Sequence, residues 1–305
     1  MRSALANWNR PFILFTVASA AIGAVSVGGL ILDDRVLLGA PIWLKPLKFA
    51  LSFILFGLSW GWLLSLVPKL TRTLKNASAV MITAAMLEMV AMIIQVFRGK
   101  ESHFNIATGT DALLWSIMGS TIVVFWIATL VASIVIAARR VAPPSANLAI
   151  RLGMGISLAG MLLGFLMTNQ ESTREGIAGT HSVGVVEGGP GMPLTNWSTT
   201  GGDLRIGHFV GLHALQVLPL VALGLTVLAT RHAWLRTEEV RSRMVWTAGV
   251  AYAALVALVT WQALRGQPLL QPDLLTLGAL AVILGATAAG VSWARAAQTR
   301  ELVDA

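Results

Sequence analysis

The sequence predicts an all-α integral membrane protein with about eight membrane-spanning helices. Hydrophobic residues make up 56% of the chain and charged residues only 12%, about half the share of roughly 25% that is typical of soluble domains. Apolar runs of the length that crosses a bilayer, about 20 residues, recur along all 305 residues. A polytopic helix bundle therefore explains the chain better than a soluble domain with one anchor.

Eight apolar runs are long enough to span a bilayer. They lie at about residues 12–32, 46–67, 77–98, 112–138, 150–169, 205–230, 244–264 and 274–295. The first resembles a signal peptide, but it continues to Leu32 with no polar cleavage region, so we expect a retained span. Pro46 suits a first helical turn, and Asp203 is expected to cap the sixth helix. Residues 1–305 then form a single membrane domain.

The distribution of lysine and arginine predicts the orientation. One side of the predicted bundle carries 14 of the 22 basic residues, and the side with more of them is usually cytoplasmic. We therefore expect both termini in the cytoplasm, in a bacterial-type inner (plasma) membrane. The net charge of +8 is assigned to topology, so the expected partners are the lipid bilayer and a small-molecule or lipid ligand, and nucleic acid is not expected. The absence of cysteine excludes disulfides and thiolate chemistry.

One predicted loop is much longer than the others. Residues 170–204 are rich in glycine, and they far exceed the usual two to eight residues between bundled helices. The loop is expected on the outer side, either as a mobile connection or as a lid over an outward-facing site.

A short motif occurs twice and suggests a duplication. The third span ends in QVFRGK (residues 95–100) and the seventh in QALRGQ (residues 262–267), and an aspartate precedes the next span in each case. Because four helices separate the two copies, a parallel 4+4 repeat is one explanation. Chance similarity of two short segments is the other.

The sixth span carries an unusual concentration of polar residues. At about 100° per residue, Arg205, His208, His213 and Gln216 share a sector roughly 140° wide. The opposite face carries small residues, namely Gly207, Gly211 and Ala214. Small residues favour close helix packing, so the polar sector is expected to face a cavity or other helices. Pro219 is expected to kink the helix.

The histidines allow several kinds of chemistry. His208 and His213 could act as acid–base groups near neutral pH. With His103 from the outer SHFN segment, they could also hold a divalent metal. The alternative is that they only form hydrogen bonds at the membrane surface.

The third span adds Glu88, Gln95 and Arg98 on one face. A carboxyl group near the bilayer midplane is costly unless it is paired, protonated or hydrated, so Glu88 is a catalytic or proton-carrying candidate. A protonated structural glutamate is the alternative.

The second span begins with two lysines. Lys45 and Lys48 lie on the same helical face as Ser52 and Ser59. They could extend to the lipid headgroups, or they could join Gln95, Arg98, Arg205 and Gln216 in an outward-facing pocket for an anionic substrate.

The segments WLKPLKF, SHFN and GGDLRIGHFVGLHALQ resemble those of a group of bacterial multi-span membrane proteins. The resemblance covers most of the chain. It implies the membrane architecture and carries no activity.

These observations leave three hypotheses for function. The first is a membrane enzyme with an outward-facing site for an amphiphilic or small anionic substrate. The second is a secondary transporter coupled to protons through Glu88. The third, less favoured, is a haem- or quinone-binding redox protein. The cofactor is left open, as is the oligomeric state, with a divalent metal preferred over haem.

Overall fold

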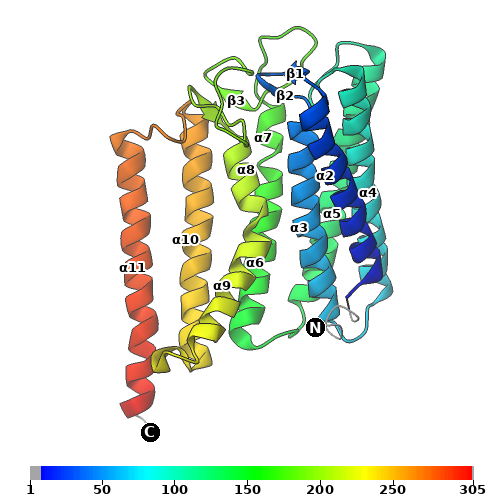
Figure 1. Ribbon diagram of the computed structural model, residues 1–305. Coiled ribbons are helices and arrows are strands. Elements are labelled where there is room, and N and C mark those ends of the chain that lie inside the picture. Colours follow the sequence, from blue (N-terminus) through cyan, green and yellow to red (C-terminus); the bar gives the residue numbers. More distant parts are fainter. Residues whose placement is uncertain (1–7, 304–305) are drawn as a thin grey trace.

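The protein is an all-helical bundle with an irregular cap at one end (Figure 1). The computed structural model describes residues 8–303, with side chains described up to residue 297. The helices are α2 (Arg10–Leu32), α3 (Leu44–Ser65), α4 (Arg72–Arg98), α5 (Gly109–Ala137), α6 (Pro144–Leu162), α7 (Phe165–Thr168), α8 (Arg205–Leu212), α9 (Ala214–Leu228), α10 (Glu238–Leu264) and α11 (Leu274–Val303). A 3₁₀ turn occupies Ala233–Leu235. Within the described residues, seven helices are long and apolar enough to span a membrane, and the bent pair α8–α9 makes an eighth if the two helices form one span. The predicted fold class is confirmed.

Polar residues set several helix starts, and these starts lie ahead of the apolar runs. The side chains of Thr71, Thr108 and Thr237 each accept a hydrogen bond from a backbone N–H in the first turn, as N-caps commonly do. Helices α4 and α10 therefore begin several residues before the predicted spans.

The sixth span differs from the prediction in two ways. It bends by 45° between α8 and α9, and the break lies at His213, while Pro219 lies inside α9. The predicted kink at Pro219 is therefore wrong in position. A proline perturbs the turn that precedes it, and here the interruption lies still further upstream. The N-cap of α8 is Leu204 and not Asp203. The Asp203 carboxylate accepts a hydrogen bond from the Arg205 N–H instead.

The helices form two groups in chain order. In the first group α2 packs against α3 and α4 against α5; in the second α6 packs against α8 and α9, and α10 against α11. Contacts of α5 with α6 and of α3 with α9 join the groups. Helix α11 lies at the edge of the bundle (Figure 1). This pairing is compatible with a 4+4 repeat, which stays a prediction.

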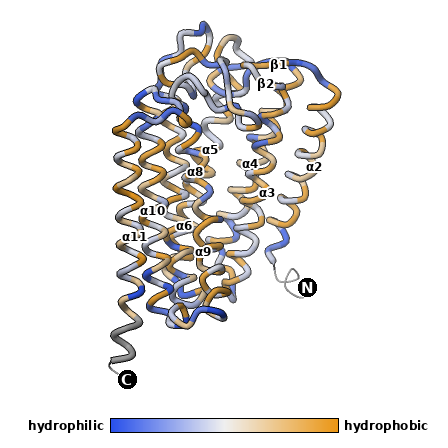
Figure 2. The backbone as a smooth tube through the Cα atoms, turned by 60° about the vertical axis from the view of Figure 1, so that its left-hand side comes forward, coloured by the Kyte–Doolittle hydropathy of each residue, from blue (hydrophilic) through white to orange (hydrophobic). Residues whose placement is uncertain are grey.

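The cap lies at the end of the bundle opposite to where α2 begins and α11 ends (Figure 1). It contains two small antiparallel pairs, β1 (Val36–Leu37) with β2 (Ala40–Pro41) and β3 (Ser182–Val183) with β4 (Gly202–Asp203). Hydrophilic segments gather at the bundle ends and hydrophobic ones along the helices (Figure 2). Exposed apolar side chains such as Leu14 and Leu274 suit contact with a bilayer.

Candidate functional site

Helix α8 lies unusually close to two neighbours, because its glycine face has no side chains. A Cβ on Gly207 would lie 2.1 Å from the Thr260 hydroxyl oxygen of α10, and a Cβ on Gly211 would lie 2.6 Å from the Gly160 Cα of α6. These contacts confirm the predicted small-residue packing face. They fix α8, and with it the polar residues on its other sides.

The close packing of α8 orients His208. Its Nδ1 lies 2.9 Å from the Gly160 carbonyl oxygen. Because a carbonyl only accepts hydrogen bonds, Nδ1 must carry the proton and Nε2 of the neutral ring keeps its lone pair. His208 is therefore arranged as a proton acceptor.

A chain of hydrogen bonds orients His213 in the same way. The Ser59 hydroxyl donates to the Leu55 carbonyl, and the Gln216 amide N–H donates to Ser59. The Gln216 carbonyl oxygen then faces His213 Nδ1 at 3.2 Å, so this Nδ1 is also the protonated nitrogen. His213 Nε2 is buried and has no partner in the described part of the chain. Both histidines thus present an unprotonated Nε2.

The two lysines of α3 differ in how they are used. Lys48 donates a 2.7 Å hydrogen bond to the Thr195 carbonyl of the cap. Lys45 has no hydrogen bond within the described residues, and it interacts electrostatically with Glu88, Glu187 and Arg205. An ammonium group prefers three acceptors, so Lys45 has capacity for a ligand.

Arg205 is held by the protein itself. It forms an ion pair with Asp203 at 2.5 Å and donates to the Asn196 carbonyl at 2.6 Å. The Asp203 carboxylate also accepts from the Ser198 N–H. Arg205 therefore ties α8 to the cap, and its guanidinium has little capacity left for a substrate.

His103 folds inward from the outer loop. Its Nε2 lies 3.5 Å from a carboxyl oxygen of Glu88, whose other oxygen is buried without a partner among the described residues. Burial, together with the positive charge of Lys45, keeps the His103 pKa well below its usual value. The neighbouring Phe104 has a φ of 62°, which is uncommon for a non-glycine residue and costly for a bulky one.

A charged network lies in the cap above these residues. Arg174 pairs with Glu101 and with Glu187, and Glu187 also contacts His181. Burial alone would raise the pKa of Glu187, but the facing His181, Lys45 and Arg205 outweigh it and lower the pKa to about 2. This carboxylate is therefore ionised at neutral pH and holds the cap in place.

Gln95 and Arg98 take part in a separate clamp. Both donate to the buried carboxylate of Asp111, at 2.9 and 2.6 Å. The second copy of the motif forms a related clamp, in which Arg265 pairs with Asp273. The clamps link α4 to α5 and α10 to α11, so a structural role accounts for the shared motif. The predicted substrate-binding role of Gln95 and Arg98 stays untested.

The three histidines proposed for a metal do not assemble a site in the described residues. No group of three His, Cys, Asp or Glu side chains there is arranged to hold a metal ion. We define the outer polar site by the residues that electrostatic interactions or hydrogen bonds do connect: Lys45, Lys48, Glu88, His103, Arg205, His208 and His213.

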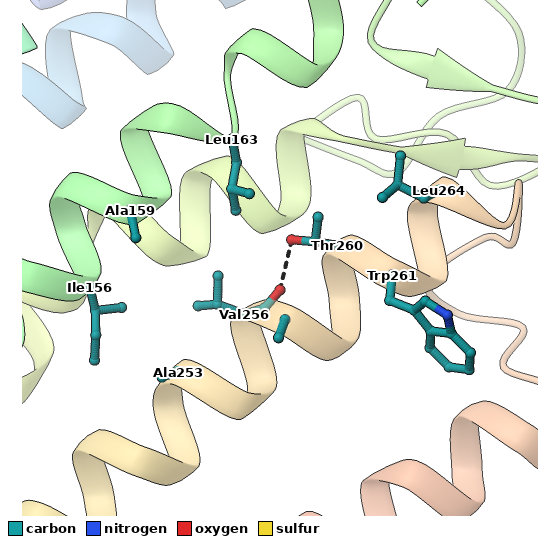
Figure 3. A pocket seen from close by; sticks show the side chains of 9 residues that line it. Ile156, Ala159, Leu163, Ala253, Val256, Thr260, Trp261 and Leu264 are labelled. Atoms are coloured by element: carbon teal, nitrogen blue, oxygen red, sulfur yellow. Dashed lines mark hydrogen bonds between the residues drawn. The ribbon is translucent and has the colours of Figure 1, made fainter.

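A shallow groove of about 410 Å³ lies between α6 and α10 (Figure 3), and none of its lining residues belongs to the outer polar site. Apolar side chains line it, and its Thr260 hydroxyl already donates to the Val256 carbonyl. It offers no group for chemistry.

Several site features could not be anticipated from the sequence. Residue spacing reveals neither the approach of His103 to Glu88 nor the bonding of Asp111 to Gln95 and Arg98. The charged residues of a glycine-rich loop were a visible signal for the cap network, although their pairing was not. No known protein family, curated protein or solved structure matches the chain.

Proposed function

We propose that the protein is a membrane enzyme that acts by proton transfer on a substrate with a small anionic group, bound in the outer polar site. The observation that carries the proposal is the set of groups left without a partner once the internal bonds are assigned. In the outer polar site, among the described residues, these are the Lys45 ammonium, the Nε2 atoms of His208 and His213, and one carboxyl oxygen of Glu88.

Lys45 and His208 suit different parts of one reaction. Lys45 would bind the anionic group, since a cation in a desolvated site attracts negative charge strongly. Nε2 of His208 would accept a proton from a water molecule or a hydroxyl group, as a general base does. The Gly160 carbonyl would hold the imidazole in the required tautomer.

Hydrolysis of an activated phosphodiester tests the proposal. We would measure 4-nitrophenolate release from 4-nitrophenyl decyl phosphate by the purified protein in phosphatidylcholine nanodiscs. General-base catalysis contributes about 10²–10⁴-fold to a rate, so His208→Gln should lower the rate at least 100-fold. His232→Gln, in an inner loop, is the matched control. Equal rates for the native protein and His208→Gln would contradict the proposal.

A proton-coupled transporter is the second candidate, and Glu88 favours it. This carboxyl group is 3% exposed, has one unpartnered oxygen and faces His103, as a proton carrier inside a membrane would. Acidification of pyranine-loaded proteoliposomes under an inward proton gradient would test it. Ligand-dependent flux that Glu88→Gln abolishes would favour transport over the enzyme.

A further inference from the structure

The outer polar site continues into the bilayer along one helix seam. Lys48, Ser52, Leu55 and Ser59 follow at spacings of three to four residues on α3, and such residues share a helix face. The hydrogen bond from Gln216 to Ser59 shows that this face is turned toward α9. The α3 face and the segment Phe209–Gln216 together form what we call the seam.

Side chains of the seam retain contact with the surroundings at membrane depth. Leu55 is 44% exposed and Phe209 is 39% exposed. Phe209 also packs against His213, with ring centroids 4.4 Å apart. An unpartnered imidazole nitrogen therefore lies beside an apolar surface that the protein leaves open.

The cap restricts access from the water side. Lys48 is bonded to Thr195, Arg205 to Asn196, and the Asn196 amide to the Leu38 carbonyl. These contacts come from one short cap segment and reach both helix groups. A ligand that arrived from water would have to displace them, whereas one that arrived along the seam would not.

We propose that the ligand of the outer polar site is an amphiphile of the outer leaflet with an anionic headgroup, which reaches Lys45 laterally through the seam between α3 and α8–α9. The inference rests on the proposed function and adds the substrate class. Charge complementarity favours this ligand. The Lys45 ammonium, which has no hydrogen bond within the described residues, lies at the capped end of the seam, and the exposed apolar side chains of Leu55 and Phe209 lie further along it. This order matches an anionic headgroup followed by a hydrocarbon chain. His213 Nε2 would accept a hydrogen bond from a hydroxyl group of the ligand or from a water molecule.

Photolabelling in nanodiscs tests the lateral path. Phosphatidic acid and phosphatidylcholine, each with a diazirine in the acyl chain, would be compared by mapping labelled peptides with mass spectrometry. We expect peptides of the seam to be labelled at least fivefold more by phosphatidic acid. Leu55→Trp should remove this enrichment, because the indole fills the seam. Leu87→Trp, at a site of similar exposure (45%) on α4 and therefore outside the seam, should retain it.

Binding of inorganic phosphate, followed by calorimetry on the same samples, separates the two proposals. Phosphate binding that persists while the seam shows no enrichment, or an enrichment that Leu55→Trp leaves unchanged, would overturn lateral access and leave the anion site standing. No phosphate binding together with no enrichment would overturn both.

Discussion

Substitution of Gly160 tests whether α8 lies directly against α6. A Cβ at this position would lie 2.4 Å from two backbone atoms of α8, the Gly211 carbonyl carbon and the Leu212 nitrogen. Backbone atoms cannot rotate away, so Gly160→Ala must push the helices apart, and overpacking of this kind costs about 1–3 kcal/mol.

Gly155 supplies a control on the same helix, since a Cβ there would meet nothing within 4 Å. Both substitutions gain the same intrinsic helix propensity of about 1 kcal/mol. The difference between the two variants therefore isolates the clash, about 1–3 kcal/mol.

Thermal unfolding of detergent-purified protein, followed by tryptophan fluorescence at one scan rate, measures this difference. We expect Gly160→Ala to unfold several degrees below Gly155→Ala. It should also hydrolyse 4-nitrophenyl decyl phosphate more slowly, because the Gly160 carbonyl orients the proposed base His208. If the two variants unfold at the same temperature, the close α6–α8 contact does not exist and the assigned His208 tautomer loses its basis.

Three further predictions concern the cap, the clamps and metal binding. The lowered pKa of Glu187, about 2 against 4.5, corresponds to roughly 3 kcal/mol of stability that is fully present above pH 4.5 and is lost as the pH falls toward 2. The hydrogen-exchange protection factors of the cap amides, which correct for the intrinsic pH dependence of exchange, should therefore fall over this range in the native protein. In Glu187→Gln they should be low throughout the same range. Asp111→Asn should lower the free energy of unfolding by about 3 kcal/mol, because the Asp111 carboxylate is fully buried. Asp273→Asn should lower it by about 1 kcal/mol or less, because the Asp273–Arg265 pair is exposed. Equal decreases in the thermal unfolding temperature of the two variants would contradict this assignment. Metal analysis of purified protein should find only sub-stoichiometric zinc, and stoichiometric zinc that is lost on His208→Ala would restore the metal hypothesis.

Hydrophobic run length was sufficient to predict the helices, because a bilayer demands about 20 apolar residues wherever the chain crosses it. Helical phase was also sufficient for the packing of α8, since Gly207 and Gly211 mark the only face that permits such close contact. Run length could not place the bend at His213. The break lies six residues before Pro219, so the proline did not mark its position.

The site was predicted only in part, because the partners of its polar groups come from segments that are distant in the sequence. Arg205 and Lys48 were expected to bind substrate, but cap carbonyls and Asp203 occupy them. His103 and Glu88 were predicted separately, and nothing in their spacing indicates that His103 Nε2 lies 3.5 Å from a Glu88 carboxyl oxygen. The lateral seam depends on side-chain exposure, which the sequence does not reveal.

The central claim is that the uncommitted Lys45 ammonium binds the anionic group of a ligand inside the outer polar site. An experimental structure of the protein in nanodiscs with decyl phosphate tests it most directly. We predict the phosphate group within hydrogen-bond distance of Lys45 Nζ, with the decyl chain lying along Leu55 and Phe209. A phosphate bound at Arg98 or Arg265, or a Lys45 site left empty at saturating decyl phosphate, would contradict the claim.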